Sequence, residues 1–311
     1  MTVPPRETIR IKPVILAMRW LLMVAGLLVL GAGNSLFIFS ARTDEYFAWT
    51  IANRLIAAFL GAAFWSSCAL EILSAREQAW SRARMAVPAV LIFTILTAIA
   101  TLVHRDIFHD TWIAWAWIAI YLIVPPVFMV VLGMQLQEPG IDEPRWCPLP
   151  VWLRLMSVIQ GIVLLVAGAA LMLVPNDAMT RWPWPLTELA ARATGAWLIG
   201  LGVIAVQAAW ENDFLRVRAS AIAALLLALF ESVALVRYPD TVDFGSIEAI
   251  IYVFALANVA VVGVVSLLGY LRASREYPGT VAAGLAAVDR AHARDDIPRR
   301  SEVDGGTRCG N

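Results

Sequence analysis

The sequence predicts an all-α integral membrane protein: about eight transmembrane helices arranged as two parallel four-helix repeats, with both termini cytosolic. Three observations predict this fold class. Of the 311 residues, 60% are hydrophobic and 15% are charged, whereas a soluble domain carries roughly 25% charge. Apolar runs of membrane-crossing length recur along the chain, and arginine is concentrated in alternate connections between them.

Each apolar run is predicted to be a helix, because hydrocarbon cannot satisfy an open backbone and roughly 17 to 25 helical residues cross a bilayer. In the N-terminal half the predicted spans are residues 18–39, 51–73, 86–103 and 112–136. In the C-terminal half they are residues 155–174, 189–210, 219–236 and 247–271.

The first span has an alternative interpretation as a secretory signal peptide, because a basic segment precedes it and small residues at 31–35 offer a cleavage site. The apolar run continues through residues 36–39, however, which is longer than a typical signal-peptide core. A transmembrane helix is therefore favoured.

Arginine positions predict the orientation, because cytoplasmic connections carry an excess of Arg and Lys. The N-terminus, the even-numbered connections and the segment after the last span are basic, with Arg6, Arg10, Lys12, Arg19, Arg76, Arg82, Arg84, Arg145, Arg154, Arg216, Arg218, Arg272 and Arg275. The odd-numbered connections are poorer in Arg and richer in Trp. Their Trp49, Trp112, Trp182 and Trp184 are expected to anchor helices at the outer membrane boundary.

The two halves share features that hydrophobicity alone would not produce. Each second span carries an arginine and a small-x3-small pair and ends at a glutamate, and each third span follows an Arg-x-Arg sequence. The matching residues are Arg54 and Arg192, Ala57/Gly61 and Ala196/Gly200, Glu71 and Glu211, and Arg82/Arg84 and Arg216/Arg218. Because each unit has an even number of spans, we expect parallel units related by a pseudo-two-fold axis along the membrane normal.

These features divide the chain into four parts. Residues 1–136 and 151–273 are the two four-helix transmembrane units, and residues 137–150 form a proline-rich, hinge-like cytosolic linker. Residues 274–311 are expected to be a disordered cytosolic tail. The small-x3-small pairs, together with Gly161 and Gly168, are expected to allow close helix packing.

Ionisable residues at membrane depth are costly and point to a site. Glu231 lies six residues before Arg237, roughly 9 Å below the end of its helix at 1.5 Å per residue. Arg54 and Arg192 form a symmetric pair near the outer interface that is predicted to bind an anionic group, with Arg192 also a candidate partner of Glu231. The alternatives are a structural ion pair or a protonated carboxyl for Glu231, and a helical pair between Arg192 and Glu188.

Five further residues near the outer side are secondary candidates: His104, His109, Arg237, Asp243 and Glu248. The histidines are five positions apart, which does not place them on one helical face, so no metal or haem ligation is predicted. Cys68, Cys147 and Cys309 share no metal-ligand spacing, and no disulfide or cofactor is expected.

No enzyme signature is present: the chain lacks a P-loop, a G-x-S-x-G, an H-E-x-x-H and a dinucleotide fingerprint. An intramembrane transferase that uses Glu231 or Asp243 as a base stays an alternative, so enzymatic activity is left open. The formal net charge of zero gives no indication of nucleic-acid binding.

The sequence therefore predicts a multi-pass protein of the plasma membrane that is in contact with the lipid bilayer. The first functional hypothesis is permease-like transport or binding of a small anionic or zwitterionic solute or lipid at an outward-facing cavity, through Arg54, Arg192 and Glu231. The second is a membrane scaffold or sensor subunit, without catalytic activity, that binds a protein partner through the linker or the tail.

Overall fold

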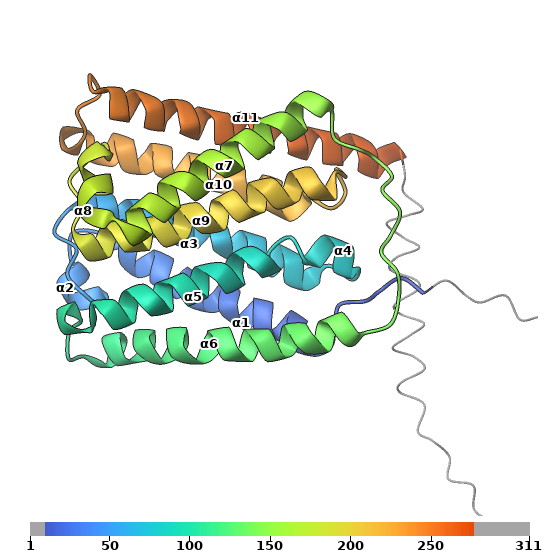
Figure 1. The fold of residues 1–311 in the computed structure, drawn as a ribbon, viewed down its shortest axis with the longest axis horizontal. Helices are drawn as coiled ribbons and strands as arrows, with labels where there is room; N and C mark the ends of the chain where they lie inside the picture. The colour runs from blue at the N-terminus through green and yellow to red at the C-terminus, as the bar shows by residue number, and fades with distance from the viewer. Residues whose placement is uncertain (1–9, 277–311) are drawn as a thin grey trace, which may run out of the picture.

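The computed structural model describes residues 10–276, in which helices run between the two ends of a bundle (Figure 1). Seven of these helices are long and apolar enough to cross a membrane, so the chain is a multi-pass membrane protein. They are α1 (Leu16–Gly33) continued by the π-helix η1 (Asn34–Ile38), α3 (Arg54–Arg76), α6 (Trp112–Gln137), α7 (Val151–Leu173), α9 (Glu188–Glu211), α10 (Arg218–Arg237) and α11 (Ile247–Glu276).

The predicted span 86–103 forms the shorter helix α5 (Val87–Val103), with 17 residues, about 25 Å at 1.5 Å per residue. Its length is limited by the turns on either side. A short helix, α4 (Trp80–Ala83), takes up the preceding residues, and proline in the first turn of α5 fixes where the helix begins. The chain thus has seven helices of full spanning length and one shorter apolar helix among residues 10–276.

The connections define two ends of the bundle (Figure 1). The loop end carries the short helices α2 (Thr43–Tyr46), η2 (Arg105–Ile107), α8 (Pro175–Ala178), η3 (Met179–Arg181) and η4 (Pro239–Thr241). The opposite linker end carries α4 and residues 138–150. The tail from residue 277 onwards lies outside the described residues, as do Cys309 and Arg6.

Helix packing follows the same pattern in the two halves of the chain. In the first half α1 packs along α3 and α5 packs on α6, and in the second half α7 packs along α9 and α10 packs on α11. The third helix of each half also packs on the second helix of the other half, α10 on α3 and α5 on α9. The two halves therefore share one interlocked interior.

Glycines bring paired helices close together, as predicted for Gly61, Gly161 and Gly168. A Cβ on Gly61 would lie 2.5 Å from the backbone N of Phe37 in η1, and one on Gly168 would lie 2.7 Å from the carbonyl O of Gly195 in α9. Gly161 is equally close to α9, whereas Gly200 has only ordinary contacts with α5. Backbones that approach this closely require the absence of a side chain.

Aromatic residues fill the loop end of the bundle. Trp112 is 79% exposed, as expected of a lipid-boundary anchor, but Trp49 and Trp184 are 4% and 2% exposed. Trp49 packs against Trp117 with ring centroids 5.3 Å apart. The loops that carry Trp49 and Trp184 fold back over the helix ends, so these two rings stabilise the interior instead of facing the lipid boundary.

Candidate functional site

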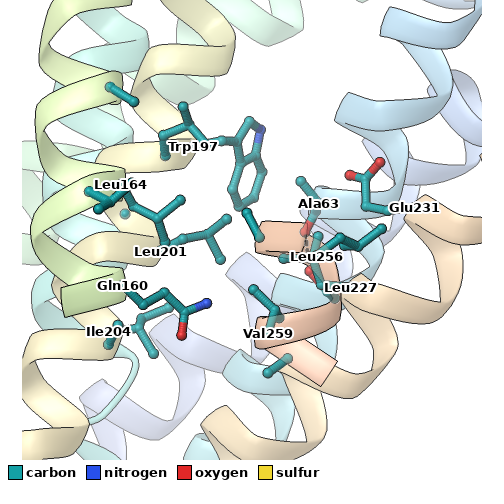
Figure 2. Close-up of a pocket in the computed structure, with 18 of the residues that line it drawn as sticks. Ala63, Gln160, Leu164, Trp197, Leu201, Ile204, Leu227, Glu231, Leu256 and Val259 are labelled. Carbon is teal, nitrogen blue, oxygen red and sulfur yellow. Dashed lines mark hydrogen bonds between the residues drawn. The ribbon is translucent and has the colours of Figure 1, made fainter. Parts of the chain in front are cut away.

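A cavity of about 680 Å³ lies between the helix pair α7/α9 and the helix pair α10/α11, with α3 and α5 behind it (Figure 2). Its lining extends from Asp177 on α8 and Glu248 on α11 at the loop end to Ser157 on α7 and Ser266 on α11 nearer the linker end. A cavity of this size is in the range that small-molecule sites occupy.

The cavity opens at the side of the bundle between α7 and α11. These helices approach each other near the linker end and diverge towards the loop end (Figure 1). The lining residues Val163 on α7 and Ile251 on α11 are 55% and 60% exposed. The cavity therefore reaches the side surface of the bundle between these two helices.

Most of the lining is apolar. Figure 2 shows Leu164, Leu201 and Ile204 on one wall, with Leu227 and Leu256 among the residues opposite them. Such walls favour a ligand with a hydrocarbon body, because burial of apolar area stabilises a complex by about 25 cal/mol per Å² before the costs of association.

Glu231 supplies a carboxyl group to this apolar lining. Its side chain comes from the middle of α10 and is 2% exposed. Tyr252 of α11 donates a hydrogen bond from Oη to Oε2 of Glu231 over 3.2 Å. The other oxygen, Oε1, is buried without a hydrogen-bond partner among residues 10–276, and none of the ion pairs in that range includes Glu231. This oxygen therefore departs from the rule that buried polar atoms are hydrogen-bonded.

Gln160 of α7 adds a second polar group. Its amide points into the cavity from the wall opposite Glu231 (Figure 2). The side chain makes no hydrogen bond with another described residue, which leaves both a donor and an acceptor available.

Aromatic rings surround the Tyr252 side of the cavity. The ring of Tyr252 lies 5.0 Å from Trp184, 6.3 Å from Trp182 and 6.4 Å from Phe59, measured between centroids. Phe59, Trp182 and Tyr252 are part of the lining, and Trp184 lies behind them. We refer to these four residues as the aromatic cluster.

Of the three residues predicted to form the site, Glu231 alone lines the cavity within the described chain. Arg54 begins α3, is exposed and forms no ion pair with another of residues 10–276. Arg192 donates from Nη1 to Oε2 of Glu188 over 3.3 Å and also to Nε2 of His104. The predicted helical pair of Arg192 with Glu188 is thus present.

His104 follows the last residue of α5 and is buried. Burial, and then the neighbouring Arg192 guanidinium, lower the pKa of His104 below its usual 6.5. Because Nε2 accepts the hydrogen bond from Arg192, the neutral ring carries its proton on Nδ1.

Three of the remaining secondary candidates have structural contacts at the loop end. His109 Nε2 lies 2.9 Å from Oγ1 of Thr50. Arg237 donates to the carbonyl oxygens of Phe37 and Ile38 at the end of η1, over 2.7 and 3.3 Å. Asp243 accepts from the backbone N of Gly245 just before α11.

Glu248 lines the mouth of the cavity in the first turn of α11, together with Asp177 and Arg181. Within residues 10–276, no three His, Cys, Asp or Glu side chains are grouped so that they could hold a metal ion.

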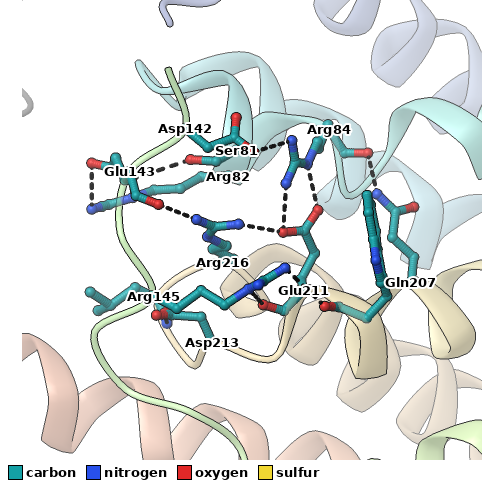
Figure 3. Close-up of polar contacts among 12 residues, drawn as sticks. Ser81, Arg82, Arg84, Asp142, Glu143, Arg145, Gln207, Glu211, Asp213 and Arg216 are labelled. Atoms are coloured by element: carbon teal, nitrogen blue, oxygen red, sulfur yellow. Dashed lines mark hydrogen bonds and ion pairs between the residues drawn. The ribbon is translucent and has the colours of Figure 1, made fainter. Parts of the chain in front are cut away.

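A second polar cluster lies at the linker end and was not predicted as a unit (Figure 3). Glu211, at the end of α9, is 0% exposed and accepts from Arg84 over 2.5 and 2.9 Å and from Arg216 over 2.7 Å. Arg216 also donates to the carbonyl O of Glu143, and Arg82 binds the Glu143 carboxylate over 2.7 and 3.1 Å. These contacts fasten residues 138–150 to both halves.

The matched Arg-x-Arg sequences and the terminal Glu211 were the signals for this cluster, but sequence does not show which arginine reaches which acid. The cavity and the aromatic cluster were missed because Trp182 and Phe59 are far apart in the chain.

Comparisons with models of protein families, with curated proteins and with solved structures find no match for this chain.

Proposed function

We propose that the chain is a permease-like protein of the cell membrane that binds a small amphipathic molecule or lipid in the cavity and transports it. The observation that carries this proposal is the Oε1 atom of Glu231, a buried acceptor without a partner among residues 10–276, in a cavity that is otherwise mostly apolar. A ligand with a hydrocarbon body and one polar group satisfies both features. Glu231 is the coupling or gating carboxyl in this proposal.

The proposed topology has eight spans, with α5 as the shorter one, and both termini at a cytosolic linker end. The excess of Arg in the connections at that end supports this orientation. The cavity mouth at Asp177 and Glu248 then faces outwards.

We also propose that the two four-helix units, 1–136 and 151–273, are parallel repeats. The packing pattern supports this, because exchanging α1, α3, α5 and α6 for α7, α9, α10 and α11 leaves every major helix contact in place. In this proposal residues 137–150 are the linker between the two units, and residues 274–311 are the tail that follows the second unit.

An anion bound between Arg54 and Arg192, as the sequence suggested, has less support than a ligand in the cavity. Arg192 already has Glu188 and His104 as partners, and neither arginine is part of the cavity lining within the described residues.

Transport is tested in proteoliposomes with three lipophilic probes of similar size: tetraphenylphosphonium, tetraphenylborate and neutral triphenylphosphine oxide. We expect the protein to speed the movement of at least one probe. Leu201→Trp, which fills the cavity, should abolish that effect, whereas Val166→Trp on the exposed side of α7 should not. The proposal fails if proteoliposomes take up all three probes no faster than empty liposomes do.

Glu231→Gln keeps the size of the side chain and removes its ionisable carboxyl. In the permease-like proposal this variant still inserts and folds but loses transport. Normal transport by the folded variant would rule out Glu231 as the coupling group.

A second candidate function, a scaffold that binds a protein partner, is favoured by the linker-end cluster. Its ion pairs hold residues 138–150 against both halves and give the linker end a fixed surface. Deletion of residues 274–311, or substitution of the exposed linker residues, should then remove a co-purifying partner. An unchanged set of partners in both variants would argue against this function.

A further inference from the structure

We propose that the ligand of the cavity is a lipophilic monovalent cation, such as an amphiphile with an ammonium head. This inference rests on the proposed function, since it specifies the charge of the molecule that the cavity takes. It differs from the anionic or zwitterionic solute that the sequence suggested.

The charge of the cavity lining favours a cation. The ionisable acids are Glu231, Asp177 and Glu248, and the one basic residue among the described lining residues is Arg181. Arg181 is exposed at the mouth, whereas Glu231 is 2% exposed in the interior. A cation in the interior therefore meets a carboxyl, and an anion there meets no basic group of the described chain.

Glu231 has no countercharge among residues 10–276. Tyr252 satisfies Oε2 with a neutral hydroxyl, and Oε1 has no partner among residues 10–276. A buried carboxylate is stable only when it is paired. A bound cation supplies that pairing at the position where the structure leaves an acceptor unused.

The aromatic cluster also favours a cation. Tyr252 contacts Glu231, and Phe59 and Trp182 line the cavity beside the Tyr252 ring. The faces of these rings carry the negative part of the aromatic quadrupole. Aromatic rings beside a carboxyl are typical of sites for alkylated ammonium groups, which make few hydrogen bonds and bind through charge and ring contacts.

The shape of the remaining space in the cavity fits the hydrocarbon part of such a ligand. The apolar walls formed by α7, α9 and α11 continue from the aromatic cluster towards Ser157 and Ser266, and the cavity opens to lipid between α7 and α11. A hydrocarbon tail fits in this part, with the cationic head at Glu231.

The test is equilibrium binding to the purified full-length protein in lipid nanodiscs, with radiolabelled tetraphenylphosphonium as the probe. Protein-free nanodiscs correct for partition of the probe into lipid. We expect saturable binding to the wild type. Affinity should fall about tenfold or more in Glu231→Gln, and by several-fold in Trp182→Ala. Glu45→Gln, an exposed acid at the same end of the bundle, serves as the matched control and should bind normally.

Tetraphenylborate and triphenylphosphine oxide separate this inference from the proposed function. If either of them binds as tightly as tetraphenylphosphonium, or if Glu231→Gln keeps full affinity for the cation, the inference is wrong while the cavity remains a ligand site. If none of the three probes binds, the proposed function fails as well. Thermal unfolding of each variant confirms that lost binding is not caused by misfolding.

Discussion

Arg84 binds Glu211 through two hydrogen bonds, from Nε to Oε1 over 2.5 Å and from Nη2 to Oε2 over 2.9 Å. The arginine precedes α5 in the first half of the chain, and the glutamate ends α9 in the second half. Both members are more than four-fifths buried. This pair therefore joins the two halves at the linker end.

Glu211→Ala is expected to destabilise the protein strongly, because it leaves Arg84 and Arg216 buried without their shared carboxylate. Removal of one member of a buried ion pair costs about 3–5 kcal/mol. The measurement is thermal or denaturant unfolding of the purified protein in detergent.

The Arg42–Glu45 pair is the control for this prediction. Its side chains are 57% and 49% exposed, so Glu45→Ala should change the free energy of unfolding by about 1 kcal/mol or less. Equal effects of Glu211→Ala and Glu45→Ala would show that the linker-end cluster does not join the halves.

Close packing of α7 on α9 predicts that Gly168→Ala is destabilising. The new Cβ would lie 2.7 Å from the carbonyl O of Gly195, which is backbone and cannot turn aside. Overpacking of this kind costs about 1–3 kcal/mol. Gly133→Ala in α6 is the matched change at an open position, where no atom lies within 4 Å.

At Gly133 the higher helix propensity of alanine should leave stability unchanged or raise it by up to about 1 kcal/mol. Unfolding temperatures of the two variants, recorded under one condition, give the comparison. A stable Gly168→Ala protein would mean that the two helices are further apart than the structure has them.

Much of the fold could be predicted from sequence because the membrane restricts the options. The apolar runs at 112–136 and 155–174 correspond to α6 and α7, and the glycines at 161 and 168 indicated the close approach to α9. These features depend on local composition and spacing. The predicted span 86–103 also matches α5 (Val87–Val103) to within one residue, so the short length of this helix was visible in the sequence.

The candidate site was less predictable, because it depends on helix angles that sequence does not encode locally. Glu231 stood out as an acid at membrane depth, and the structure has it in the cavity lining. Its partner could not be predicted: Tyr252, and not Arg192, reaches Glu231. Trp182 was expected at the lipid boundary, but its loop folds inwards and the ring lines the cavity.

His104 predicts a loss of stability at low pH. Its pKa is lowered in the folded protein by burial and by Arg192, so the unfolded chain binds more protons between the folded pKa and about 6.5. The free energy of unfolding therefore falls as the pH is lowered through that window, and the contribution of His104 is fully present above it.

His104→Gln keeps an acceptor for Arg192 but does not titrate, so part of this pH dependence should disappear. Unfolding of wild type and variant between pH 5 and 8 measures the difference. If the two curves have the same slope below pH 6.5, the folded-state pKa of His104 is not lowered.

The proposed orientation predicts which end of the bundle a membrane-impermeant maleimide can reach in intact cells. With the native cysteines changed to serine, Asp44→Cys tests the loop end and Pro139→Cys tests the linker end, since both positions are exposed. The native thiol of Cys147 has a raised pKa because of burial and nearby Asp213, but its removal still avoids background labelling. We expect label on Asp44→Cys in intact cells, and on both variants after lysis.

Label on Pro139→Cys in intact cells would reverse the orientation. The Arg-rich connections would then lie on the non-cytosolic side, against the usual charge bias. The mouth at Asp177 and Glu248 would also open to the cytosol. The direction of transport depends on this result, whereas binding at Glu231 does not, because the lateral opening between α7 and α11 is reached from the lipid in either orientation.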